Sequence, residues 1–239
     1  MTDNLVEPIY KNPQYNDYYL EAMSSCLKDV LLLIKDAYKE GNAFTNKYET
    51  FLETAFEILP SFVVTDPSNE PYNCIVHGDV WVSNMLFLYS KDTSKPQDVC
   101  FLDFQQCRYG SSAIDICRFL YVMVDKATRE THGEYLLHCY HDGLKEILNQ
   151  FQLDHEYLFP FSTVKSQLKK YSVYVLIISI FTLVYSMSEN EDENFSGGET
   201  VTLKNSNKKI RHYLSADYRR KVFEVIEEFA DLGYLDLDD

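Results

Sequence analysis

Positive charge is scarce in this sequence, which has 22 Lys and Arg residues against 37 Asp and Glu residues and a formal net charge of −15. A nucleic-acid binder needs a basic face to neutralise phosphates, so this balance argues against a nucleic-acid partner. The same deficit argues against docking on an anionic membrane surface. We therefore expect no nucleic acid and no membrane among the partners.

Cysteine pairs and a targeting segment are also missing. The six cysteines include no C-x-x-C pair, so we expect reduced, buried thiols in a reducing compartment rather than a zinc site or a disulfide scaffold. Residues 1–16 lack the basic start and apolar core of a signal peptide. These features predict a cytoplasmic protein.

No apolar run is long enough to cross a bilayer. The longest, 173–187, has 15 residues and contains Ser179, Thr182 and Ser186, whereas a span needs about 20 residues. We interpret this run as a buried core helix, with a membrane segment as the weaker alternative.

Two common catalytic motifs are absent as well: the chain contains neither G-x-S-x-G nor H-E-x-x-H. His138 and His141 stand three apart on a predicted helix, a spacing that can hold a metal. Because no further ligands follow at a recognisable spacing, we expect a surface or packing role for this pair.

The 239 residues are 46% hydrophobic and 15% aromatic, which indicates a globular chain of one large or two small domains. Apolar residues at steps of three and four predict helices over 18–40, 51–59, 114–126, 134–149, 163–187 and 217–232. Gly41 and Gly233 are expected to stop the first and last helices, and Pro60 the second. Strands are predicted over 73–77, 85–89 and 99–103, with a polar turn at 90–98 that makes a small hairpin. Residues 188–206 are predicted to form a loop. The predicted helices and the small strand cluster together give an α+β fold class that is mostly helical.

The polar residues suited to chemistry concentrate around the predicted strands. His77-Gly78-Asp79-Val80-Trp81-Val82-Ser83-Asn84 lies between two strands, and Asp103-Phe104-Gln105 ends the third. Phosphoryl transfer needs a carboxylate to orient the attacking hydroxyl, and an amide and a second carboxylate to hold Mg²⁺. The five-residue step from Asp79 to Asn84 matches the protein-kinase spacing H-R-D-L-x-x-x-N before D-F-G. The alternative is that Asp79 and Asp103 only cap turns and that His77 packs in the core.

The two motifs together resemble the ecdysteroid kinase-like (CHK kinase-like) family. The resemblance rests on H-G-D-V-W-V-S-N followed by L-D-F-Q-Q-C-R-Y-G-S-S-A-I-D-I and is sharpest over 75–120. That family belongs to the aminoglycoside phosphotransferase and choline kinase superfamily, which shares the protein-kinase fold. The resemblance therefore implies a protein-kinase-like C-terminal lobe whose small β-hairpin element carries the catalytic loop.

The resemblance also implies roles for individual residues. Asp79 would be the catalytic base, and Asn84 and Asp103 would bind Mg²⁺ and, through it, ATP. His77 would brace the catalytic loop, and Asp115 would hydrogen-bond the backbone of that loop. The acceptor would be a small-molecule alcohol, for which the resemblance suggests an ecdysteroid or another lipophilic hydroxylated compound.

The sequence departs from the family before His77. A kinase of this fold has an N-terminal β-rich lobe with a Gly-rich loop and a strand lysine that grips the phosphates, yet Gly41 is the only glycine before Gly78. We therefore interpret 1–239 as a single C-terminal lobe, with a helical lead-in over 1–72, the catalytic segment over 73–112 and a helical subdomain over 113–239. An incomplete gene model, a truncated kinase and a non-catalytic chain all fit this pattern. The alternative function is an inactive pseudokinase that binds a hydrophobic ligand or a partner, and a further alternative is pairing with a separate upper-lobe chain.

Overall fold

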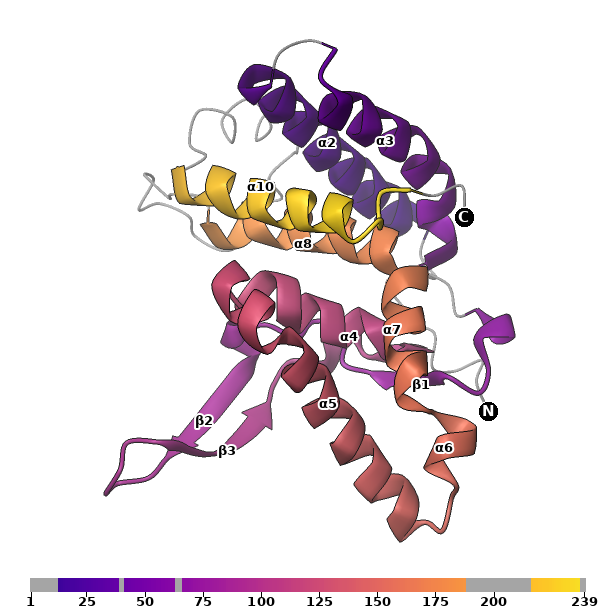
Figure 1. Cartoon of the computed structure of the whole chain (residues 1–239), viewed down its shortest axis with the longest axis vertical. Helices are drawn as coiled ribbons and strands as arrows, with labels where there is room; N and C mark the ends of the chain where they lie inside the picture. Colours follow the sequence, from indigo (N-terminus) through magenta and orange to yellow (C-terminus); the bar gives the residue numbers. More distant parts are fainter. Residues whose placement is uncertain (1–12, 39–40, 63–65, 188–215, 237–239) are drawn as a thin grey trace. The chain divides into compact units, whose positions relative to one another are not determined.

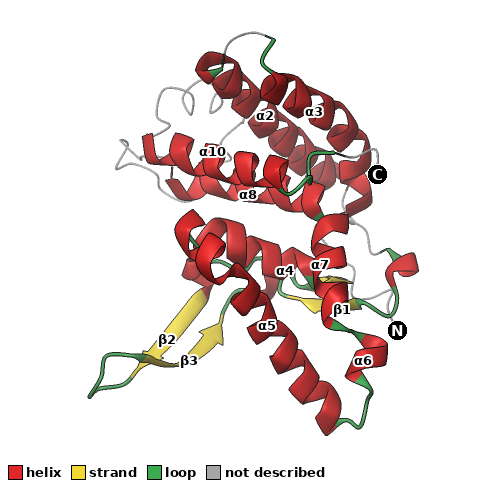
Figure 2. Ribbon diagram, in the orientation of Figure 1, coloured by secondary structure: helices red, strands yellow, loops and turns green. Residues whose placement is uncertain are grey.

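The computed structural model describes residues 13–38, 41–62, 66–187 and 216–236. Within these residues the chain is mostly helical and has two small antiparallel sheets, so the α+β class is confirmed (Figure 2). The chain divides into two compact units, one built from Ser61–Val175 and the other from Pro13–Pro60 and Leu176–Asp239. The predicted loop over 188–206 lies outside the described residues.

The second unit is a cluster of helices: α2 (Pro13–Ala37), α3 (Ala43–Phe62), α10 (Ala216–Asp231) and the larger part of α8 (Ser172–Met187). Each helix turns an apolar face inward, and buried residues include Leu27, Phe51, Ile180 and Phe229. Polar contacts also join the helices, since the hydroxyl of Tyr38 donates to Glu227 Oε1 at 2.7 Å.

The ends of these helices agree only in part with the ends predicted from the sequence. Helix α2 starts at Pro13, five residues before the predicted start, because proline suits the first helical position. Helix α3 was predicted to stop before Pro60 but runs to Phe62, since a proline removes one hydrogen bond without ending the last turn. Gly233 has φ +71° and ends α10 as expected, with the N–H of Tyr234 bonded to Phe229 O at 2.8 Å.

The first unit contains both sheets. Strand β1 (Asn73–Val76) pairs with β4 (Arg108–Ser111), and β2 (Met85–Tyr89) pairs with β3 (Pro96–Phe101) as the predicted hairpin (Figure 1). Strand β2 has its predicted bounds. Strand β3 begins at Pro96, so the predicted turn is shorter, and β4 was not predicted.

The helices of the first unit are α4 (Ala113–Arg118), α5 (Lys126–Gln150), α6 (His155–Leu158) and α7 (Phe161–Lys170). The predicted helix over 114–126 is helical as far as Met123, as α4 followed by a π-helical turn, Phe119–Met123, and it ends before the predicted boundary because Val124 is extended. The predicted helix over 163–187 is divided into α7 and α8 at Tyr171, whose backbone leaves the helical conformation.

The described helices include none that is both long and apolar enough for a bilayer span. The run over 173–187 forms α8, and its side chains from Val173 to Ile178 are all buried, which confirms the core-helix interpretation.

All six cysteines are free thiols, but the prediction that they are buried is wrong for most of them. Cys26 and Cys117 are buried, whereas Cys74, Cys100 and Cys139 are exposed and Cys107 is intermediate. Cys100 is exposed because it lies on the β2–β3 hairpin, whose strands have little cover on either face.

Candidate active site

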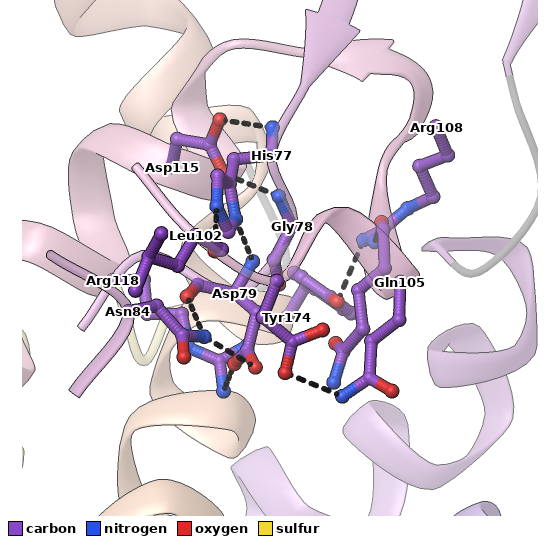
Figure 3. A network of polar contacts seen from close by, with 12 residues as sticks. His77, Gly78, Asp79, Asn84, Leu102, Gln105, Arg108, Asp115, Arg118 and Tyr174 are labelled. Carbon is purple, nitrogen blue, oxygen red and sulfur yellow. Dashed lines mark hydrogen bonds and ion pairs between the residues drawn. The ribbon is translucent and has the colours of Figure 1, made fainter. Parts of the chain in front are cut away.

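The loop between β1 and β2 folds back so that Asp79 and Asn84 touch (Figure 3). A 3₁₀ turn, Val82–Asn84, reverses the chain, and the N–H of Asn84 donates to Trp81 O at 2.9 Å. The side-chain Nδ2 of Asn84 then donates to the main-chain oxygen and to Oδ2 of Asp79, both at 3.0 Å. Asp79 and Asn84 are both buried, so the five-residue spacing places an amide directly against a carboxylate.

The second motif is attached to this loop through the peptide groups of Leu102. Its N–H donates to Asn84 O, and its carbonyl accepts from Nε2 of His77, each at 2.9 Å. Nδ1 of His77 accepts from the N–H of Asp79 at 3.3 Å, so Nε2 must carry the hydrogen of the neutral ring. Leu102 therefore bonds both ends of the first loop, His77 and Asn84, and Asp103 follows it directly in the chain.

Asp103 itself lies beyond the strand that was predicted to contain it. Strand β3 ends at Phe101 because Asp103 has φ +59°, a left-handed conformation that a strand does not accommodate. The side chain is exposed, and Nε2 of Gln105 donates to its Oδ2 at 3.1 Å. The carboxylate is therefore oriented by a neighbour and open to solvent, which suits a cation ligand.

Helix α4 holds the start of the loop between β1 and β2 through Asp115. Its Oδ2 accepts from the N–H of His77 at 2.7 Å, and its Oδ1 accepts from the N–H of Gly78 at 2.8 Å. Burial raises the pKa of Asp115, while the two N–H donors act in the opposite direction. Strand β1 ends at Val76, one residue earlier than predicted, because His77 gives its N–H to this carboxylate.

At Gly78 the loop passes close to the segment that follows Asp103. Its φ is +79°, and a Cβ at this position would lie 2.2 Å from Gln106 O and 2.8 Å from Nη1 of Arg108. Arg108 is buried and donates to Gln106 O at 3.3 Å and to the hydroxyl of Tyr174 at 2.8 Å. The glycine thus permits both the left-handed turn and the contact with the segment after Asp103.

One residue in contact with Asp79 was missed by sequence reasoning. Arg118, at the end of α4, forms an ion pair with Oδ1 of Asp79 and donates from Nη1 to Gly78 O at 2.8 Å. The signal that could have found it is weak: Arg118 and Asp115 are the only charged residues in the otherwise apolar stretch 113–123, and they stand three apart.

The residues predicted to bind magnesium fit that ion chemically. Asn84 turns its amide nitrogen to Asp79, which leaves its Oδ1 as the atom for a cation, and Asp103 offers a carboxylate. Among the described residues, no three His, Cys, Asp or Glu side chains gather as a metal site, either here or elsewhere. Mg²⁺ is commonly held by one or two carboxylates and otherwise by water and phosphate oxygens, so a small protein donor set is sufficient.

The histidine pair on α5 is occupied by packing. The ring of His138 stacks on Phe161 with centroids 3.8 Å apart, and Nε2 of the buried His141 hydrogen-bonds Phe159 O at 2.9 Å. These contacts agree with the predicted surface or packing role.

Comparison with known proteins bears directly on the two motifs. A family model described as the ecdysteroid kinase-like family matches residues 1–153, more than half of the 239 residues and a range that includes both motifs. No curated protein and no solved structure matched the chain. The kinase-like description of the family indicates phosphotransferase chemistry. On this match, the chain belongs to the ecdysteroid kinase-like family.

Proposed function

We propose that this chain is an ATP- and Mg²⁺-dependent kinase that transfers the γ-phosphoryl group to the hydroxyl of a lipophilic alcohol such as an ecdysteroid. The observation that carries the proposal is the anchoring of Leu102 to both His77 and Asn84, which supports a common site for the two motifs. In this proposal residues 1–239 form one kinase-like C-terminal lobe.

Asp79 would act as the base. Its carboxylate is buried and fixed by neighbours at both oxygens, and it lies in a loop rather than in a helix or strand. It would accept a hydrogen bond from the acceptor hydroxyl and take its proton as the new O–P bond forms. The bond from the γ-phosphorus to the bridging oxygen breaks in the same step, and ADP leaves.

Asn84 and Asp103 would hold the metal. Bound Mg²⁺ would supply charge neutralisation on the β- and γ-phosphate oxygens. Asn84 is suited to couple the two functions, since its amide nitrogen contacts Asp79 while its amide oxygen remains for the cation. His77 and Asp115 would keep the loop in shape through their contacts with Leu102 and with the loop backbone.

The test is transfer of ³²P from Mg·ATP to a panel of hydroxylated acceptors that includes an ecdysteroid, with Asp79→Asn compared with the parent chain. We expect the variant to lose activity by at least about 100-fold, the scale typical of a removed acid–base group. Asp92→Asn makes the same charge change at the exposed tip of the hairpin and should leave the rate unchanged. A variant Asp79→Asn within tenfold of the parent would remove Asp79 from this role.

Calorimetric titration with Mg·ATP and with an ecdysteroid separates the kinase from the binding-module alternative. Micromolar Mg·ATP binding that weakens in Asp103→Asn would support the kinase. Millimolar or absent nucleotide binding together with retained ecdysteroid binding would favour a pseudokinase that holds a hydrophobic ligand.

A further inference from the structure

Arg118 is a buried cation in direct contact with the proposed base. Its residue is 8% exposed, and Asp79 is equally buried at 8%. One arm of the guanidinium, Nη2, pairs with Oδ1 of Asp79, and the other, Nη1, donates to Gly78 O at 2.8 Å. A planar guanidinium makes two such contacts in fixed geometry, which a lysine ammonium does not reproduce.

The carboxylate of Asp79 is held from two sides. Arg118 occupies Oδ1, and Nδ2 of Asn84 occupies Oδ2 at 3.0 Å. Because each carboxylate oxygen has two lone-pair sites, one site on each oxygen remains for a substrate hydroxyl. The two donors therefore fix the plane of the carboxylate and the directions from which a hydroxyl can be accepted.

Two side chains of helix α4 hydrogen-bond the N–H and the carbonyl of Gly78. Asp115 accepts from its N–H at 2.8 Å, and Arg118, three residues later on α4, donates to its carbonyl at 2.8 Å. Residues three apart lie on one face of a helix, so a single turn of α4 contacts both the backbone of Gly78 and the carboxylate of Asp79.

Charge gives a separate reason for a cation at this position. A buried carboxylate is strongly unfavourable without a counter-charge, and removal of one partner from a buried pair leaves the other uncompensated. The Asp79–Arg118 pair is neutral as a whole, so an anionic triphosphate can approach the loop with less repulsion than a lone carboxylate would cause.

We propose that Arg118 is a positioning residue that fixes the carboxylate of Asp79 for the acceptor hydroxyl, an inference that rests on the proposed kinase function. The guanidinium fork is required, and positive charge alone does not replace it. For Arg118→Lys, which keeps the charge, the inference predicts an effect on the transfer step and little effect on nucleotide binding.

The experiment compares the full chain with Arg118→Ala, Arg118→Lys and the control Arg129→Ala. Arg129 is also 8% exposed and donates from Nη1 to two backbone carbonyls, Leu120 O and Val124 O, but belongs to no site described above. Transfer kinetics with varied acceptor, Mg·ATP binding by calorimetry and thermal melting are measured for each.

We expect Arg118→Lys to lower kcat by about 100-fold, the loss typical of one misplaced catalytic donor, with the Kd for Mg·ATP within about threefold of the parent. Arg129→Ala should lower the melting temperature but keep kcat near the parent value. A parent-like kcat in Arg118→Lys, or a loss of kcat in Arg129→Ala as large as that in the Arg118 variants, would overturn the inference.

A readout independent of activity is the side-chain amide signal of Asn84 in ¹H–¹⁵N NMR, identified by its loss in Asn84→Asp. Because Nδ2 of Asn84 donates to the Asp79 carboxylate, the signal should move toward a free amide in Arg118→Lys and stay in place in Arg129→Ala. An unchanged signal in Arg118→Lys would overturn the positioning role. If the parent chain transfers no phosphate, the proposed function fails, and the NMR comparison still decides whether Arg118 positions Asp79.

Discussion

Substitution of Gly78 by alanine should destabilise the first unit through two separate effects. The left-handed conformation, φ +79°, costs about 1–2 kcal/mol for an L residue. The added Cβ would lie 2.2 Å from the carbonyl oxygen of Gln106, a backbone atom that cannot rotate away, and such overpacking costs about 1–3 kcal/mol. The sum is about 2–5 kcal/mol, a large part of the stability of a typical domain.

Urea unfolding followed by tryptophan fluorescence measures this loss. Trp81 is the single tryptophan of the chain and lies three residues from Gly78, so its emission reports on the first unit. Gly143→Ala is the matched control in that unit: it lies in helix α5, where the added Cβ meets nothing within 4 Å, and should stabilise by up to about 1 kcal/mol.

Gly41→Ala separates the two effects of the Gly78 change. Gly41 has nearly the same φ, +78°, but open space around the added Cβ, so it should lose only the conformational part, about 1–2 kcal/mol, measured by circular dichroism. The reasoning is refuted if Gly78→Ala and Gly41→Ala lower the free energy of unfolding equally, because the contact with Gln106 would then carry no energy.

Two further changes test electrostatic contacts through pH. Hydrogen bonds from Ser68 and Lys170 lower the pKa of Asp66 to about 2, so its stabilisation is present above pH 3.8 and is lost as the pH falls through about 2. Asp66→Asn should therefore lower the unfolding free energy by no more than about 1 kcal/mol at pH 7, and urea titrations should show this difference shrinking as the pH falls through about 2. The hydrogen bond to Glu227 raises the pKa of Tyr38 to about 12, so its contribution is complete below pH 10 and lost as the pH rises through 12. Tyr38→Phe should lower the unfolding free energy by about 1 kcal/mol from pH 7 to 10, and a deficit that persists unchanged at pH 12 would contradict the Tyr38–Glu227 contact.

The fold was predictable where local pattern and tertiary structure agree. Strand β2 lies where a short apolar run predicts a strand, and helix α10 lies within one residue of where helical periodicity places it. Strand β4 has the sequence R-Y-G-S, which carries no alternation and becomes a strand through its pairing with β1. The break at Tyr171 was equally hidden, since apolar residues continue on both sides of it.

The candidate site divides in the same way. The spacing of Asp79 and Asn84 is a local property of one loop, and their contact follows from a single 3₁₀ turn. The contact of Arg118 with Asp79 joins residues 39 positions apart in the sequence, and no periodicity in the chain encodes it. Sequence reasoning therefore identified the loop residues and Asp115 on α4, but it missed Arg118, which reaches Asp79 from the same helix.

The short length of α4 has a consequence for motion in the site. Six residues form this helix, and a π-helical turn follows it directly, so few backbone hydrogen bonds resist its fraying. The amide protons of His77 and Gly78 are bonded to a side chain of this helix. Their hydrogen exchange with solvent therefore requires the two bonds to Asp115 to break, and a local opening of α4 would break them together with the contact between Arg118 and Asp79.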